Sequence, residues 1–120
     1  MRDLVDGSSS TIAIGERRDK ATNGSGHREA AVWFGIMNPR STRDFAYDAA
    51  GTGAQYINKG AGWWFTMGFS SNHPQGTQFV FMDGSTHFIN ENIDHVMDSA
   101  VNSTFERLLS INDGQPVGSY

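Results

Sequence analysis

The sequence contains no cysteine, which excludes disulfide bonds and thiolate metal sites. Charged residues make up only 18% of its 120 residues, and Ser, Thr, Asn and Gly contribute much of the remaining polarity. This composition is typical of a turn-rich β or α+β domain, because helical bundles need more Ala, Leu, Glu and Lys. The length predicts a single globular domain over residues 1–120.

Basic residues are scarce in the second half of the chain. Residues 60–120 contain one, Arg107, against six acidic residues, and the whole chain carries a formal net charge of −4. A surface of this sign repels phosphate backbones, so we do not expect nucleic acid as a partner. No apolar run reaches the roughly 20 residues of a membrane span, so we expect no membrane contact from this chain itself.

Strand signals lie in the first third of the chain. A turn cluster at residues 6–10 precedes a β-branched run, which predicts a strand at about 11–17. The apolar run at 31–37 has the length of a buried strand and stops before Pro39. The irregular stretch from 39 to 62 is too long for an ordinary hairpin connection and is interpreted as a surface loop or an insertion.

An aromatic segment follows at residues 61–69, AGWWFTMGF. Trp63, Phe65 and Met67 alternate with other residues, which predicts a strand with one strongly apolar face. Packing in the core is the first interpretation of these aromatic rings. An exposed platform is the alternative, in which Trp63 and Trp64 would stack against a glycan or a partner.

Residues 77–90, TQFVFMDGSTHFIN, predict a β-hairpin. Asp83-Gly84 tolerates the positive φ angles of a two-residue type I′ turn, so the register follows by counting outward from it. Phe81 is then opposite Thr86, and Phe79 is opposite Phe88. These four residues share one face, which we expect to be the core face. The residues expected on the other face are Val80, Met82, His87 and Ile89.

The last third of the chain predicts one helix. Apolar residues recur at three- and four-residue spacing between Ile93 and Leu109. Ser103 and Glu106 form a capping-box pattern, so we predict a regular helix at 103–110, and residues 94–102 stay open between helix and loop. Residues 112–114, Asn-Asp-Gly, are expected to end the helix.

The sequence contains few patterns that are typical of a catalytic or metal-binding site. No nucleophile-elbow pattern frames a serine, and no phosphate-loop pattern uses the glycines. The spacings of 14 and 8 residues between His73, His87 and His95 match no compact zinc signature. Calcium suits the oxygen-rich second half better, with Asp83, Asp94 and Asp98 as candidate ligands. The alternative is that these carboxylates are simply solvated.

The segment at 70–94 places nine residues between His73 and Asp83-Gly84. This arrangement resembles the H-X9-DG signature of bacterial prepilin-like proteins that carry a C-terminal domain of unknown function. A second block, DGSSSTIAIGE at 6–16, is similar to another run of that family, and Asp113-Gly114 with Val117-Gly118 resembles its close. The sequence departs from the pattern at Gln75, where glycine is common.

The resemblance implies a β-rich α+β fold: an antiparallel sheet with long loops and one short C-terminal helix, forming a pilin-like globular head. It implies no enzymatic activity and no cofactor, an extracytoplasmic location at the cell surface or envelope, and other pilin-like subunits or envelope proteins as partners. The family's N-terminal hydrophobic helix is not among residues 1–120, so we expect the chain to correspond to the head. The implied structural motif residues are Asp6, Gly7, His73, Pro74, Gly76, Asp83 and Gly84.

His73 is the motif residue with the most chemistry to offer. We expect it to lie near the base of the hairpin, buried, and to donate a hydrogen bond to a backbone carbonyl or a carboxylate. Two rival functions stay open. One is a binding module for calcium or a glycan, and the other is a hydrolase in which His73 acts as base and Asp83 orients it.

Overall fold

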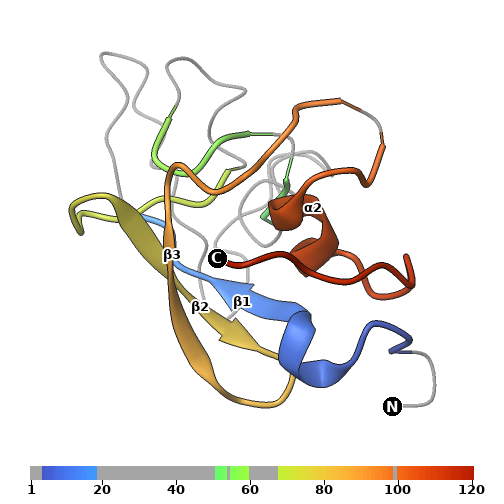
Figure 1. Cartoon of the computed structure of the whole chain (residues 1–120). Helices are drawn as coiled ribbons and strands as arrows, with labels where there is room; N and C mark the ends of the chain where they lie inside the picture. Colours follow the sequence, from blue (N-terminus) through green and yellow to red (C-terminus); the bar gives the residue numbers. More distant parts are fainter. Residues whose placement is uncertain (1–3, 19–50, 54, 60–67, 99) are drawn as a thin grey trace, which may run out of the picture.

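The computed structural model describes residues 4–18, 51–53, 55–59, 68–98 and 100–120, which are drawn in colour in Figure 1. The predicted strand at 31–37 and the tryptophans Trp63 and Trp64 lie outside these ranges. The described elements are the 3-10 helix η1 (Ser8–Ser10), the strands β1 (Ile12–Gly15), β2 (Gly76–Phe81) and β3 (Thr86–Asn90), and the helix α2 (Thr104–Leu109).

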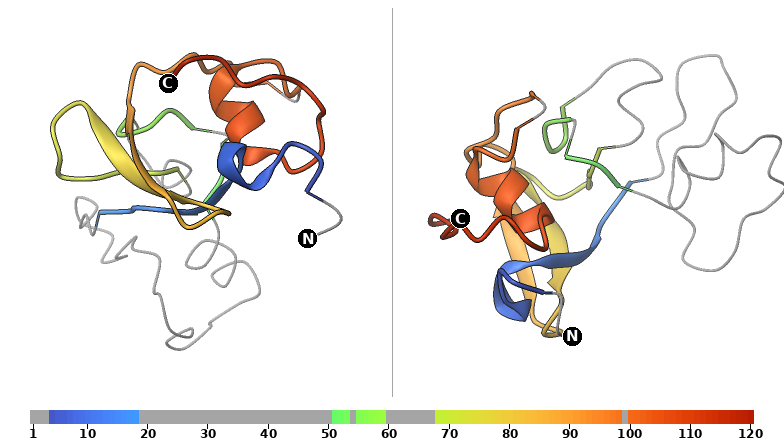
Figure 2. Two further views of the ribbon diagram at one scale, coloured as in Figure 1. Left: turned by 60° about the horizontal axis from the view of Figure 1, so that its bottom comes forward. Right: turned by 90° about the vertical axis from the view of Figure 1, so that its right-hand side faces the viewer.

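The three strands form one antiparallel sheet in the order β1-β2-β3. Helix α2 and the C-terminal segment lie on the same side of this sheet (Figure 2). The fold is therefore a β-rich α+β arrangement, as the composition and the strand patterns predict. Among the residues described, no helix has the length and apolarity needed to cross a membrane.

Strand β1 forms where the β-branched run begins, within the predicted range of 11–17. Ile12 pairs with Phe81 and Ile14 with Val80, and the register shifts between these two pairs. This irregularity is a β-bulge, which lets Ile12 point into the core while Ile14 remains 42% exposed. Strand β1 ends at Gly15 and is therefore shorter than the predicted strand at 11–17.

The hairpin is present, but its predicted register is wrong by one residue. Phe79 pairs with His87 and Val80 with Thr86, and the Phe81 N–H donates to the Ser85 carbonyl oxygen at 2.9 Å. The loop therefore holds three residues, 82–84, with Gly84 at φ 87°. A type I turn followed by a left-handed glycine closes such a loop, in place of the two-residue type I′ turn.

The shift moves the side chains of β3 to the opposite faces. Phe88 is 45% exposed and Ile89 is fully buried, the reverse of the prediction. Thr86 is exposed as well, and His87 is half-buried on the core side. The prediction for β2 is confirmed, because Phe79 and Phe81 are each 1% exposed. A one-residue slip has this effect because side chains alternate between the faces of a sheet.

Helix α2 begins as the capping box predicts. Ser103 is the N-cap, and its N–H and hydroxyl donate to the Glu106 carboxylate at 2.9 and 2.7 Å. In the stretch left open between helix and loop, the described residues 94–98 and 100–102 contain no helix. The helix ends at Leu109, before the predicted Asn-Asp-Gly stop at 112–114, because Ser110 is extended.

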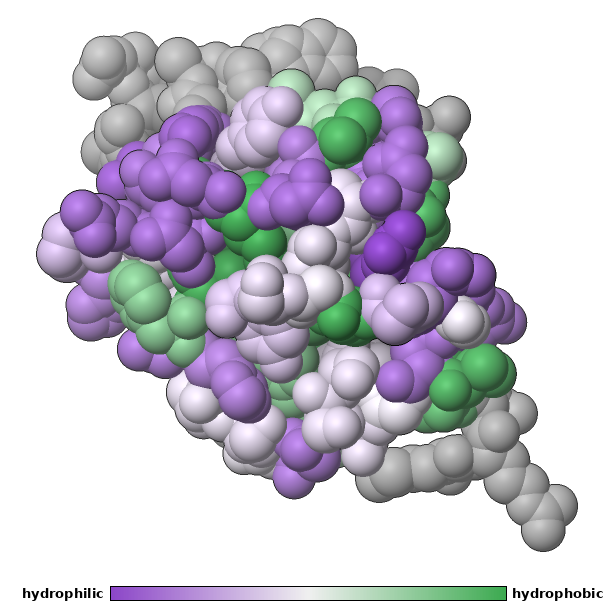
Figure 3. Space-filling model, viewed as in Figure 1, coloured by the Kyte–Doolittle hydropathy of each residue, from purple (hydrophilic) through white to green (hydrophobic). Residues whose placement is uncertain are grey.

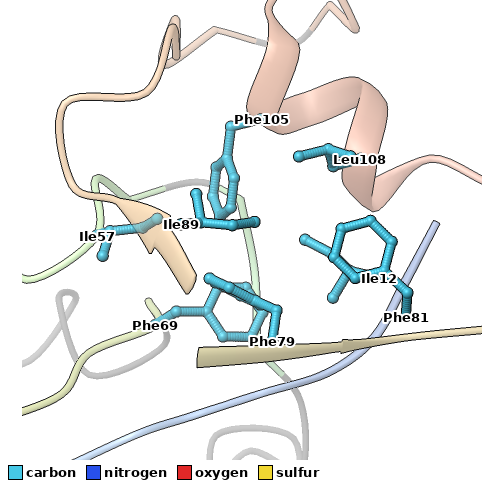
Figure 4. Packing of buried hydrophobic residues seen from close by; sticks show 8 residues of the cluster. All are labelled: Ile12, Ile57, Phe69, Phe79, Phe81, Ile89, Phe105 and Leu108. Carbon is cyan, nitrogen blue, oxygen red and sulfur yellow. The ribbon is translucent and has the colours of Figure 1, made fainter. Parts of the chain in front are cut away.

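The core lies between the sheet and α2 (Figure 4). Rings of Phe69, Phe79 and Phe105 pack edge to face, with centroids 5.0 to 6.1 Å apart. Edge-to-face packing of this kind adds attraction beyond simple area burial. The members of the core are Ile12, Ile57, Phe69, Phe79, Phe81, Ile89, Phe105 and Leu108.

Candidate functional site

The first motif block lies against the turn of the hairpin. The backbone N–H of Asp83 donates to the Ser8 carbonyl at 3.1 Å, and that of Met82 donates to the Thr11 carbonyl at 2.9 Å. Gly7 precedes η1 at φ 87°, a left-handed backbone conformation that glycine adopts without strain. The blocks at 6–16 and 70–94 are therefore joined at this point by main-chain hydrogen bonds.

Asp83 uses its carboxylate to shape the turn. Its Oδ1 accepts hydrogen bonds from the Ser85 N–H at 2.9 Å and the Ser85 hydroxyl at 2.6 Å. The hydroxyl bond first, and then the N–H bond, lower the pKa of Asp83 below its ordinary value of 3.8. The same hydroxyl lies 2.9 Å from Nε2 of His87. The carboxylate of Asp83 is thus engaged within its own loop.

Asp6 connects the two ends of the chain. Its Oδ2 accepts from the Asp113 N–H at 2.9 Å, and its Oδ1 accepts from the Gly114 N–H at 2.7 Å. The Val5 N–H also donates to the Ile111 carbonyl at 3.0 Å. The first block is therefore bound to the third, and a carboxylate with two backbone donors is a strong acceptor arrangement.

The His-Pro-x-Gly run forms the entry to β2. The hydroxyl of Ser71, which is 2% exposed, donates to the Gly76 carbonyl at 2.6 Å and accepts from the His73 N–H at 2.9 Å. The side-chain oxygen of Asn58 accepts a hydrogen bond from the Ser71 N–H at 2.8 Å. A Cβ on Gly76 would lie 2.3 Å from the Ile89 carbonyl, so only glycine fits there.

Gln75 stands at φ 69°, where the resembled pattern has glycine. Glycine adopts this left-handed conformation freely, whereas a residue with a Cβ is strained in it. The Gln75 carbonyl accepts the Glu91 N–H at 2.8 Å, which holds the turn closed against the end of β3. The turn therefore keeps the left-handed conformation that suits glycine, and the Gln75 backbone is strained in it.

The side chain of His73 is not buried, which corrects the sequence prediction. It is 57% exposed, and its Nε2 lies 3.8 Å from Oε1 of Glu16, which is too long for the predicted hydrogen bond to a carboxylate. Glu16 itself holds β2 in place, because its Oε2 accepts from the Thr77 hydroxyl and the Gln78 N–H, each at 3.2 Å. The tight proline turn keeps the imidazole outside the core.

His73 and Asp83 do not come together. They lie beyond opposite ends of β2, whose six residues span about 20 Å. A base and its orienting carboxylate must be in hydrogen-bond contact, so these two residues do not form a catalytic pair.

The other two candidate calcium ligands, Asp94 and Asp98, also accept hydrogen bonds from the chain. Asp94 accepts from the Thr104 N–H at 3.0 Å, which caps the start of α2. Asp98 accepts from the Ala100 N–H at 2.7 Å, and this bond is the main reason that its pKa is lowered. Within the described ranges, no group of three or more His, Asp or Glu side chains is arranged to hold a metal ion.

Among the described histidines, His95 is the buried one, at 8% exposure. Its Nε2 lies 2.6 Å from the Gly53 carbonyl, and its ring packs edge-on against Tyr56 and Phe105. It therefore connects Gly53 and Tyr56 to Phe105 of helix α2. The three histidines singled out in the sequence make separate contacts.

Several supporting contacts are not evident from the sequence. Asn58 at φ 59° donates to both the Gly76 carbonyl and Glu91. Asp94 caps a helix that begins ten residues later. The Asp6 contact joins residues more than a hundred positions apart. Asp and Asn next to turns favour local caps, but the sequence gives no signal for distant partners.

Comparison with known proteins gives one result. A family model described as "Protein of unknown function (DUF1559)" matches residues 1–96. No curated protein and no solved structure was found to be similar to the chain. The match covers the first two motif blocks and four-fifths of the chain. The chain therefore belongs to the DUF1559 family of proteins of unknown function.

Proposed function

We propose that this chain is a non-enzymatic structural domain, the globular head of a pilin-like protein of the cell envelope. Support comes from the motif blocks, which resemble those of prepilin-like proteins and follow the same order along the chain. Membership of the DUF1559 family is compatible with this role. Other pilin-like subunits or envelope proteins are the partners proposed.

The proposal depends mainly on the hydrogen bonds that the motif carboxylates accept. Asp6 accepts two backbone N–H groups near the C-terminus, and Asp83 accepts the N–H and hydroxyl of Ser85. These bonds give both carboxylates a structural task, because each one fixes backbone N–H groups of a turn. The motif on this account specifies a scaffold.

The motif glycines support the same interpretation. Gly7, Gly84 and Gly114 have φ values of 87°, 87° and 66°. Each follows an aspartate, and each adopts a backbone conformation that other residues enter only with strain. Turn formation accounts for these glycines, so their presence does not require a bound ligand.

Location can be tested by labelling living cells. We would treat cells that express the chain from its own gene with an amine-reactive reagent that cannot cross the cytoplasmic membrane. Lys59 is exposed, and it is read out by mass spectrometry of its own peptide. Lys59→Arg is the matched control, and a cytoplasmic protein reports leakage.

The proposal predicts labelling of Lys59 while the cytoplasmic membrane is intact. Labelling of Lys59 only after lysis, together with the cytoplasmic marker, would contradict an extracytoplasmic head domain. The same cells can be sheared to release surface filaments. Detection of the chain in that fraction supports a pilin-like assembly, and its complete retention with the cell body argues against one.

A further inference from the structure

Strand β3 forms one margin of the sheet, on the side of β2 opposite to β1 (Figure 1). The Phe81 N–H donates to the Ser85 carbonyl, and the Glu91 N–H donates to the Gln75 carbonyl. In an antiparallel ladder, alternate residues turn their backbone groups toward the neighbouring strand. His87 and Ile89 therefore face β2, and the backbone groups of Thr86, Phe88 and Asn90 face away from it. The Asn90 carbonyl already accepts the Ile93 N–H at 3.0 Å, so Phe88, Thr86 and the Asn90 N–H supply the outward groups for a partner.

The residues whose backbone groups face outward along this margin are exposed. Thr86, Phe88 and Asn90 are all exposed. Strand β3 contains no Lys, Pro or bulge, the devices that protect sheet edges, whereas β1 at the other margin carries the bulge between Ile12 and Ile14. On the face drawn in Figure 3, hydrophilic residues separate the exposed apolar ones into small areas. Backbone hydrogen bonding at β3 is thus the stronger basis for association.

We propose that β3 pairs in antiparallel fashion with β3 of a second copy of this chain, centred on Phe88. The two Phe88 residues would exchange both of their backbone hydrogen bonds, and Thr86 would lie opposite Asn90 of the other copy. The two Phe88 side chains would then be neighbours on the outer face. Aromatic cross-strand pairs stabilise antiparallel sheets.

The sequence around β3 is complementary to itself in this register. Counting outward from Phe88 places Glu91 opposite Ser85 and Asp83 opposite Ile93, so no like charges face each other. Phe88 is 45% exposed in the single chain, and the pairing would cover it. This self-complementarity favours a second copy over an unrelated extended segment. The pairing is open to the chain whether or not it belongs to a pilin-like protein.

Only five residues of each chain lie in β3, so the interface is small. Small interfaces are typical of weak, transient complexes. We therefore expect a monomer–dimer equilibrium that is visible at high protein concentration. It is to be measured by sedimentation equilibrium of the whole chain, up to its limit of solubility.

Crosslinking tests the register, because the natural chain has no cysteine. Thr86→Cys and Asn90→Cys chains would be mixed and oxidised to form a disulfide, which needs the two Cα atoms within about 7 Å of each other. The mixture should give a covalent dimer, since residue 86 lies opposite residue 90. Each variant alone should not, because two copies of residue 86 would be about 13 Å apart along the ladder. Equal crosslinking of Thr86→Cys alone, or none in the mixture, would overturn the proposed pairing.

A second pair of variants separates edge pairing from contact through the sheet face. Phe88→Lys places two ammonium groups opposite each other and should weaken dimerisation by roughly tenfold or more. Ile14→Lys is the matched control, because Ile14 is similarly exposed at 42% but lies on β1. It should leave dimerisation unchanged, and circular dichroism checks that both variants fold. A chain that stays monomeric at every concentration, or equal weakening by both variants, would refute the proposal.

Discussion

The Asp-Gly dipeptides show how single residues shape this molecule. In each, the glycine adopts a positive φ, at Gly7, Gly84 and Gly114. The preceding aspartate supplies an acceptor for backbone N–H groups: Asp6 for a distant turn, Asp83 for Ser85, and Asp113 for Gln115 at 2.7 Å. The two residues act together because a left-handed glycine reverses the chain and the carboxylate fixes the reversed N–H groups.

Ser85→Ala should raise the pKa of Asp83 toward its ordinary value of 3.8. The hydroxyl of Ser85 is the largest cause of the lowered pKa, and the Ser85 N–H bond that remains keeps part of the shift. Carbon-13 NMR titration of the carboxyl measures the change. The pKa of Asp98 is the internal control, because it is lowered by different donors. An unchanged Asp83 pKa would contradict the hydroxyl bond.

The sign of the accompanying stability change follows from the direction of the shift. A carboxyl with a lowered pKa in the folded state stabilises that state above its unfolded pKa, near 4. This contribution is lost as the pH falls through the folded pKa. Any difference in unfolding free energy that arises from the Asp83–Ser85 hydroxyl bond should therefore be present at neutral pH and disappear in acid.

His73→Ala should have little effect on stability. The side chain is 57% exposed, and its contact with Glu16 is 3.8 Å long. Exposed ion pairs contribute little, so we expect a loss of less than about 0.5 kcal/mol in urea unfolding. A loss of several times that size would indicate a buried role for the imidazole, as the sequence alone predicts.

At the scale of elements, the turn decides which side chains of β3 are buried. Gly84→Ala should destabilise the chain by roughly 1–2 kcal/mol, because an alanine is strained at φ 87°. Asparagine enters the left-handed region more readily, so Gly84→Asn should cost less. Urea unfolding measures both. Equal losses for the two variants would show that backbone strain is not the cause.

Helix α2 depends on acceptors at its start. Glu106 accepts from the N–H groups of Asn102 and Ser103 at 3.0 and 2.9 Å. Glu106→Ala should therefore cost about 1–2 kcal/mol in unfolding free energy. Glu106→Gln retains an acceptor oxygen and should cost less. If the glutamine variant loses as much as the alanine variant, charge rather than hydrogen bonding stabilises the helix start.

The three described strands and helix α2 could be predicted from the sequence, but the hairpin register could not. The β-branched run, the hairpin around Asp83-Gly84 and the capping box at Ser103 each have a local cause, and the structure has all three. Asp-Gly fits both a two-residue and a three-residue loop, so the dipeptide leaves the register undecided. The sequence therefore could not show that Phe88 is exposed, because its face depends on the register.

At the scale of the whole molecule, the three motif blocks meet. The first pairs with the hairpin through β1 and reaches the C-terminal turn through Asp6. Segments far apart in sequence are thus held by polar contacts as well as by the shared core. The family resemblance predicts that the motif residues are structural. It cannot show that Asp6 binds residues 113 and 114, because contacts between residues so far apart leave no local sequence pattern.

The most direct measurement of the scaffold role is the unfolding free energy of Asp6→Ala, compared with Asp98→Ala, in urea at neutral pH. Asp6 bonds two distant backbone N–H groups, and hydrogen bonds to a charged acceptor are worth about 1.5–3 kcal/mol, so Asp6→Ala should lose about that amount. Asp98 is fully exposed and its bonds are to residues within four positions, so Asp98→Ala should lose clearly less than Asp6→Ala. An Asp6→Ala chain as stable as the natural one would contradict the account.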